Sequence, residues 1–323
     1  MGTVFKRKEI WLVIIIVAIV IMITSVNSAF FSADNFWNLV RNNSLLMIAS
    51  LGMTVVIISG GIDVSISAVV TTIMMVVGRC IAFLGFNLFM AFLAAVAVGM
   101  ALGFINGLLI GKSKLPAIVV TLGTLNIING CLFLITGGKW VNGHQLPEWL
   151  ADFGNSTVAG LPVQTIITIL MAALTWFILK YTLVGRSVYA IGGNFESAAR
   201  AGINMERTLL FIYVFMGFLA GIGSVTQMSI VKMVDPHSYT GLELQVIAAV
   251  VVGGARITGG KASILGTILG VVFVTIVNNG LVLMHIASYW QNVVVGAAIV
   301  VAVSIDAIGT KNAKKRIPSV EIY

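Results

Sequence analysis

The chain has 323 residues, of which 59% are hydrophobic and only 9% are charged, with a formal net charge of +8. Soluble domains are about half apolar and roughly a quarter charged, so this composition excludes a soluble protein and indicates an integral membrane protein. Runs such as WLVIIIVAIVIMI are apolar on every face, whereas strands of a membrane barrel would alternate apolar and polar residues. The predicted fold class is therefore all-α, a polytopic membrane helical bundle.

Ten apolar segments predict about ten membrane spans. We place them at residues 10–26, 44–59, 66–84, 88–110, 116–136, 161–181, 209–230, 241–252, 264–284 and 289–308. The first follows three basic residues and is similar to a signal peptide, but the many later spans favour an uncleaved anchor. The pairs Gly60-Gly61 and Asp235-Pro236 interrupt the apolar pattern. Irregular backbone at membrane depth is tolerated where protein or a water-filled cavity surrounds it, so these breaks indicate transport.

The sequence contains a weak internal repeat. LGTLNIINGCL begins at Leu122 and LGTILGVVFVTIVNNGL begins at Leu265, so Leu-Gly-Thr and a later Asn-Gly recur with different spacing. We expect a single transmembrane domain over residues 1–323, with two five-helix halves at about 1–160 and 161–323.

The basic residues predict the orientation. With the N-terminus in the cytoplasm, fifteen of the nineteen Lys and Arg residues fall on the inner side. The exceptions are Arg41, Arg79, Lys139 and Lys232. This asymmetry agrees with the positive-inside rule, so orientation accounts for the net charge and nucleic acid is not an expected partner. An even number of spans then places both termini in the cytoplasm.

A polar island at residues 185–203, GRSVYAIGGNFESAARAGI, separates the sixth and seventh spans on the cytoplasmic side. Asn194 is a candidate N-cap for a short helix that Gly202 ends, while Gly185, Gly192 and Gly193 predict tight turns or positive φ. Glu196 and Arg200 lie one helical turn apart. The island is either an ordinary interfacial helix or a docking element for another protein. Its candidate docking residues are Gly185, Arg186, Gly193, Asn194, Glu196, Ala198, Ala199, Arg200 and Gly202.

Polar residues within the apolar spans form a second candidate set. They are Asn106, Thr121, Thr124, Asn126, Asn129, Thr226, Gln227, Glu243, Gln245, Asn278 and Asn279. Polar groups inside a membrane cost free energy unless they face a cavity or a partner helix. Amides both donate and accept hydrogen bonds, so a path lined by them suits a neutral polyhydroxylated solute better than an ion. Each residue taken singly could instead form an interhelical hydrogen bond.

The sequence argues against enzyme activity. GARITGGKA at residues 254–262 is similar to a phosphate-binding loop, but Ala255 replaces the required glycine and Ala262 the required Ser or Thr. GLLIGKS at 107–113 has one residue too few between its glycines. The two cysteines and three histidines have no metal-ligand spacing, and no nucleophile lies near a base in a known motif. We therefore expect no catalytic residue, no metal site and no cofactor.

Four segments resemble one known family. The island at 185–203 resembles the cytoplasmic coupling segment of sugar-type ABC importer permeases, the ribose and autoinducer-2 class within the branched-chain-permease-like family. SGGIDVSIS at 59–67, LPAIVVTLGT at 115–124 and AAVVVGGARITGGKASILGT at 248–267 are similar to further segments of that family. The resemblance extends over about residues 35–306. Ser67-Ala68 stands where Gly-Ser is usual and Ala255-Arg256 where Thr-Ser is common, departures that bear on the solute.

This resemblance implies a permease subunit of an ATP-driven importer in the bacterial inner membrane. Two permease subunits, identical or related, would form the pore, a periplasmic solute-binding protein would meet the outer loop at 137–160, and separate cytoplasmic ATP-binding subunits would dock at residues 194–202. The implied solute is a pentose-like sugar or an autoinducer-2-like furanosyl compound. An ion-coupled secondary transporter is the alternative, and Asp63 and Glu243 are its candidate intramembrane charges.

Overall fold

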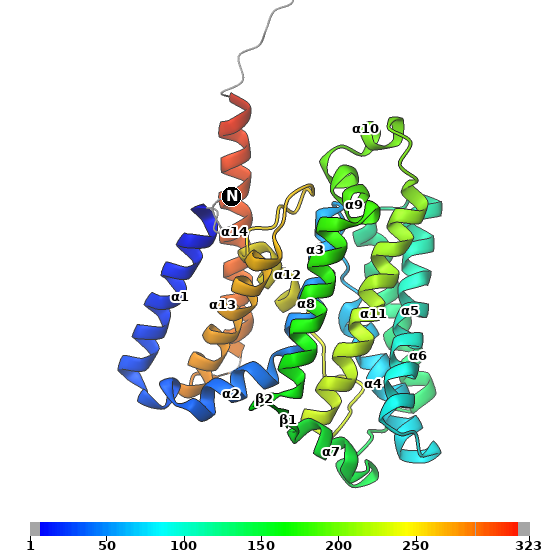
Figure 1. Ribbon diagram of the computed structural model, residues 1–323, viewed down its shortest axis with the longest axis vertical. Coiled ribbons are helices and arrows are strands. Elements are labelled where there is room, and N and C mark those ends of the chain that lie inside the picture. The colour runs from blue at the N-terminus through cyan, green and yellow to red at the C-terminus, as the bar shows by residue number, and fades with distance from the viewer. Residues whose placement is uncertain (1–6, 288, 316–323) are drawn as a thin grey trace, which may run out of the picture.

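The computed structural model describes residues 7–287 and 289–315, which form a bundle of helices whose long members run side by side (Figure 1). Its first half contains α1 (Arg7–Val26), the 3₁₀ helix η1 (Ser28–Phe31), α2 (Ala33–Asn42), α3 (Ser44–Ile58), α4 (Ile66–Leu84), α5 (Leu88–Ser113), α6 (Ala117–Thr136), the 3₁₀ helix η2 (Gly143–Gln145) and α7 (Glu148–Asn155). The remainder contains strands β1 (Thr157–Val158) and β2 (Leu161–Pro162), α8 (Val163–Tyr181), α9 (Leu183–Gly193), α10 (Phe195–Arg200), α11 (Met205–Val231), α12 (Leu242–Val252), α13 (Ile264–Leu283) and α14 (Tyr289–Lys315). The predicted all-α membrane bundle is confirmed.

Each of the ten expected apolar segments contains a helix, and the candidate spans among the described residues number fewer than ten. Within the described residues, seven helices are long and apolar enough to cross a membrane, namely α1, α4, α5, α6, α8, α11 and α13. Helices α2 and α3, bent by 46° at their junction, would together make an eighth. Helix α12 has 11 residues, so it extends only about 16 Å and falls short of a hydrocarbon layer of roughly 30 Å.

Helices α3, α4 and α11 form much of the buried interior of the bundle. Every residue of α3 except Met47 is buried. Helices α5 and α11 approach so closely that a Cβ atom on Gly99 would overlap the carbonyl of Gly217, and a Cβ on Gly217 would overlap the carbonyl of Gly99. Small residues permit this backbone approach, and van der Waals packing is the main attraction between helices in lipid.

The two ends of the bundle are structurally different. Helices α9 and α10 lie at one end, while α7 and the β1–β2 hairpin lie at the other (Figure 1). Thr157 pairs with Pro162 and Val158 with Leu161 in the hairpin. The segment expected as the long outer loop, residues 137–160, thus contains η2, α7 and β1, and it lies opposite the polar island, as expected. Helix α1 begins and α14 ends toward the end that carries α9 and α10 (Figure 1).

Candidate functional site

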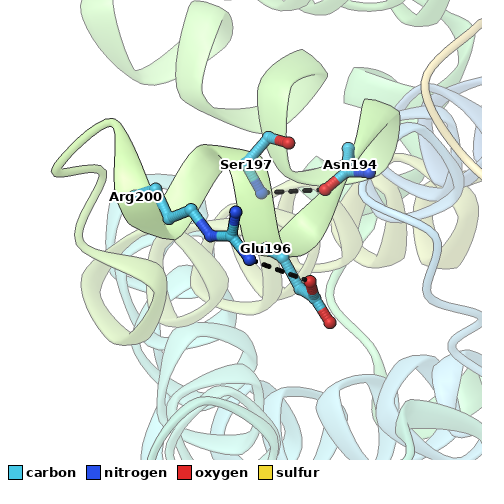
Figure 2. A network of polar contacts seen from close by, with 4 residues as sticks. All are labelled: Asn194, Glu196, Ser197 and Arg200. Carbon is cyan, nitrogen blue, oxygen red and sulfur yellow. Dashed lines mark hydrogen bonds and ion pairs between the residues drawn. The ribbon is translucent and has the colours of Figure 1, made fainter. Parts of the chain in front are cut away.

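The polar island folds into two helices in succession, α9 and α10. The Thr182 hydroxyl accepts a hydrogen bond from the Gly185 N–H (3.1 Å) and caps α9. The Asn194 Oδ1 accepts one from the Ser197 N–H (2.8 Å) and caps α10, as Figure 2 shows. The predicted short helix with Asn194 as its cap is therefore confirmed.

Gly202 ends α10 as the sequence predicts. Its φ of +81° is left-handed, a conformation that glycine adopts without steric cost. The N–H of Gly202 donates to the Ala199 carbonyl (3.0 Å), and the N–H of Ile203 donates to the Ala198 carbonyl (3.2 Å). This pair of hydrogen bonds is a Schellman motif, which satisfies two carbonyls that the helix leaves free and reverses the chain toward α11.

The expectation that Gly185, Gly192 and Gly193 form turns or adopt positive φ is wrong. All three belong to α9, and none has a positive φ. Gly185 is required for close approach, because a Cβ there would overlap the carbonyl of Ile178 at the bend between α8 and α9. Gly193 is exposed and has open space around it.

Helix α10 presents a mixed surface to solvent. Arg200 and Glu196 form an ion pair at 3.6 Å, with side chains 83% and 82% exposed (Figure 2). Such exposed i,i+4 pairs contribute about 0.5 kcal/mol or less, so the pair does little to hold the helix. Ala198 is buried against the bundle, whereas Ala199 and Phe195 are exposed. The charges and Phe195 are therefore available to a partner.

A cavity of about 580 Å³ lies between the α9–α10 segment and the ends of α5, α6 and α11. Its walls include Phe195 and Ala199 from α10, the basic Lys112 in the last turn of α5 and Lys114 just after it, and the backbone at Gly60-Gly61. The cavity therefore extends from the helix that faces solvent to the break between α3 and α4.

A buried hydrogen-bond network organises the break between α3 and α4. Asp63 is only 3% exposed, and its Oδ1 accepts hydrogen bonds from the N–H (2.9 Å) and the hydroxyl (2.6 Å) of Ser65. Asn106 Nδ2 donates to the Ser65 hydroxyl (2.9 Å) from α5. The Thr121 hydroxyl, on α6, accepts from the Val64 N–H (3.2 Å). Two predicted polar residues, Asn106 and Thr121, thus meet at this break.

Gln227 and Gln245 meet at a second place. They line a cavity of about 220 Å³ together with Tyr239 and Thr240 and the residues around Asn43, where α2 joins α3. Its wall is largely polar. Gln227 lies toward the end of α11, and Gln245 near the start of the short α12, so this cavity adjoins the second break in the apolar pattern.

The other predicted polar residues are scattered over the bundle. Thr124 is buried and donates to the Thr121 carbonyl (3.3 Å), exposed Asn126 donates to the Leu122 carbonyl of its own helix (2.8 Å), and Asn129 is half-buried on the same helix. Asn279 exchanges hydrogen bonds with Asn35 (3.1 Å), and Asn278 beside it is half-buried. Thr226 is buried and bonds within α11, and Glu243 Oε2 accepts from the Gly241 N–H (3.1 Å). Among the described residues, the hydrogen bonds of these side chains do not join them to one another in a single line.

Ser65 is a residue that the sequence reasoning missed, and its replacement tests the network. Ser65→Ala removes a donor from buried Asp63 and the acceptor of Asn106 Nδ2, so it should destabilise the fold by about 1–3 kcal/mol. Ser59→Ala is the matched control in the same break, since its hydroxyl donates only to the nearby Val56 carbonyl (2.7 Å). Thermal unfolding in detergent measures both. Equal midpoints for the two variants would contradict the structural role of the network.

The class of protein follows from comparison with known families. Residues 35–303 match the family described as the permease component of the branched-chain amino acid transport system. The chain belongs to this family. It is therefore a multi-pass permease component of an ABC import system and is not itself catalytic.

The relatives narrow the class further. The chain is 33% identical over 309 residues to the ribose import permease protein RbsC of Haemophilus influenzae, covering 95% of this chain and 94% of the relative. It is 31% identical to RbsC of Escherichia coli K12, with 93% of each covered, and 30% identical to the autoinducer 2 import system permease protein LsrC of Photorhabdus luminescens, with 97% and 95% covered. No solved structure matches at a significant level. The import system is thus of the RbsC or LsrC type.

Proposed function

We propose that this chain forms the pore, with a second permease subunit, of an importer that moves a small polyhydroxylated solute into the bacterial cytoplasm. The solute is a pentose-like sugar or an autoinducer-2-like furanosyl compound, as the names of both groups of relatives suggest. The observation that carries the proposal is the α9–α10 segment, a capped helix pair that stands at one end of a chain belonging to this family. ATP hydrolysis belongs to separate cytoplasmic subunits.

The docking face for these ATP-binding subunits is α10 with the end of α9. Phe195 supplies an apolar anchor, Ala199 keeps the surface between charges shallow, and Glu196 and Arg200 supply both signs of charge. Such a helix fits a groove on a partner. Arg186 lies exposed on α9, while Gly185, Gly193, Asn194, Ala198 and Gly202 shape and seat the segment. In the proposed orientation this end and both termini lie in the cytoplasm, which the asymmetry of the basic residues supports, and α7 faces the periplasmic solute-binding protein.

The solute path is assigned to the polar groups of the spans. The residues near the α3–α4 break are Asn106, Thr121 and Thr124, and the second cavity is lined by Gln227. Asn126, Asn129, Glu243, Asn278 and Asn279 complete the proposed set. Polar residues at two levels suit a solute that exchanges hydrogen bonds with the protein as it passes.

The alternative is an ion-coupled secondary transporter, which needs intramembrane carboxylates to bind the ion. The contacts of its two candidates, Asp63 and Glu243, favour a structural role. Asp63 accepts both its hydrogen bonds from Ser65, just before α4, and Glu243 accepts one from Gly241 at the start of α12. Both carboxylates thus satisfy polar groups at helix starts, where negative charge is stabilised. This structural use accounts for their presence without an ion-binding role.

Reconstitution tests the proposed solute class. The chain, its ATP-binding subunits and the cognate binding protein are placed in proteoliposomes with radiolabelled D-ribose as one probe and autoinducer 2 as the other. Saturable uptake of one probe, blocked by excess of its unlabelled form, is the expected result. Uptake of neither probe, in vesicles whose binding protein loads a chemically different solute, would contradict the proposed class.

Arg200→Glu tests the docking face. The pair with Glu196 is exposed, so the fold should keep its thermal midpoint, whereas a reversed charge at the partner's surface should lower solute moved per ATP hydrolysed by about tenfold. Arg200→Lys, which keeps the charge, should stay near wild type. The double swap Glu196→Arg with Arg200→Glu restores the pair within the helix but should remain uncoupled. Wild-type coupling in the single variant would show that Arg200 takes no part in docking.

A further inference from the structure

Three segments that are distant in the sequence meet at Gly192. They are the last turn of α9, the start of the α3–α4 break at Ile58 and Gly60, and the loop between α12 and α13 at Gly259 and Gly260. We call these five residues the glycine junction. A Cβ on Gly192 would overlap the carbonyl oxygen of Ile58 and would lie 2.6 Å from the Gly260 nitrogen. The end of α9 therefore rests directly on backbone, with no side chain between.

The other side of the junction shows the same closeness. A Cβ on Gly259 would lie 2.9 Å from the Gly192 carbonyl oxygen and 3.0 Å from the Gly60 Cα. The Gly260 N–H donates a hydrogen bond to the Ile58 carbonyl (2.8 Å), which ties the α12–α13 loop to the end of α3. Gly259 and Gly260 have φ of +90° and +78°, so glycine is also the residue that this loop backbone requires.

A second contact lies one turn earlier in α9. The Tyr189 hydroxyl donates to the Ala262 carbonyl (3.4 Å) in the same α12–α13 loop. The neighbour of Gly192 behaves differently, since a Cβ on Gly193 would meet nothing within 4 Å. The Gly193 Cα also lies near this loop, 3.1 Å from where a Cβ on Gly260 would stand, but of the two adjacent glycines only Gly192 lacks room for a side chain.

The two segments that α9 contacts lead to the two breaks in the bundle. The α3–α4 break continues from Gly60 to the buried network of Asp63, Ser65 and Asn106. The α12–α13 loop follows the short α12, whose other end adjoins the polar cavity at Gln245. The loop is itself packed onto α13, because a Cβ on Gly253 would overlap the Gly266 carbonyl. Close packing therefore connects α9 with both cavities, so a displacement of α9 can reach each of them.

We propose that Gly192 is a positioning residue that transmits movement of the α9–α10 segment to both breaks at once. Close-packed backbones do not compress, so a shift of the docked helices displaces Ile58 and the Gly259-Gly260 turn together. The α3–α4 break and α12 then change position in concert. This inference rests on the proposed function, because it assumes that ATP-binding subunits move α10.

Gly192→Ala and Gly123→Ala form a matched pair of variants. Both replace a glycine within a helix by alanine, and a Cβ on Gly123 in α6 would meet nothing within 4 Å, so their difference isolates the junction. In the full reconstituted complex, Gly192→Ala should keep the ATP-binding subunits and their basal hydrolysis but import about tenfold less D-ribose or autoinducer 2 per ATP. Gly123→Ala should match wild type. Equal import per ATP by the two variants would overturn the proposal.

If the Gly192→Ala complex does not assemble, hydrogen exchange on the wild-type complex tests the proposal instead. A non-hydrolysable ATP analogue should change amide exchange in α9 and, together with it, in residues 59–65 and 253–263. A change confined to α9 would overturn the proposal. The proposed function fails in a distinguishable way, since the wild-type complex would then show no ATP-driven uptake at all, whereas failure of the junction leaves wild-type uptake intact.

Discussion

Gly217→Leu should destabilise the folded protein strongly. Gly217 lies where α11 contacts α5, and even a Cβ at this position would overlap the Gly99 carbonyl oxygen and approach the Met100 nitrogen to 3.2 Å. Backbone cannot move aside as the end of a flexible side chain can, so four added carbons must separate two helices that pack along most of their length. Overpacking of a core typically costs about 1–3 kcal/mol, and we expect the upper end of that range.

Gly130→Leu is the matched control for this substitution. Gly130 lies on α6, is exposed, and has nothing within 4 Å of an added Cβ. Leucine also favours helix over glycine by roughly 0.8–1 kcal/mol, so this variant should be as stable as wild type or slightly more stable. Size-exclusion profiles and thermal midpoints in detergent measure both variants. A folded Gly217→Leu protein with a wild-type midpoint would contradict the close α5–α11 packing.

Ala199→Trp should remove ATP-driven uptake without unfolding the protein. Ala199 is exposed on α10 between Phe195 and the charged pair, so an indole there adds bulk to the surface that faces the ATP-binding subunits. Loss of a central contact in an interface commonly costs 2 kcal/mol or more, and we expect co-purification of those subunits and uptake to fall by about 30–100-fold. The thermal midpoint of the isolated chain should not change.

Ala33→Trp is the control for the added indole. Ala33 is also exposed and begins α2, at the end of the bundle away from α10. This variant should retain its ATP-binding subunits. The docking assignment would be contradicted if Ala199→Trp bound those subunits as well as Ala33→Trp does.

Local chemistry predicted the elements that depend on neighbouring residues. Asn194 caps a helix and Gly202 ends it because both effects operate within four or five residues of the chain. The positions of the apolar helices likewise follow from hydropathy. The length of α12 does not, because the sequence predicts a broken span at residues 241–252 and does not show that the helix is too short to cross the membrane. The two five-helix halves stay a prediction.

The roles that could not be predicted from the sequence depend on contacts between residues that are distant in the chain. Gly192 reads as a turn residue from its neighbours, and only the fold shows that the Ile58 carbonyl occupies the space of its missing side chain. The spans of Asn106 and Asn126 look alike in polarity, yet one side chain is buried against Ser65 and the other is exposed. These roles depend on which face of a helix packs against another helix. A segment that is apolar on every face has no pattern from which that buried face can be predicted.

The energy source for uptake tests the central claim most directly. Proteoliposomes that contain the chain and its binding protein are assayed with and without the ATP-binding subunits, in the presence of ATP or of a proton or sodium gradient. We predict that solute enters only when the ATP-binding subunits and ATP are both present, and that neither gradient supports uptake. Gradient-driven uptake by the chain without ATP would contradict the account of this protein as a permease coupled through α9 and α10.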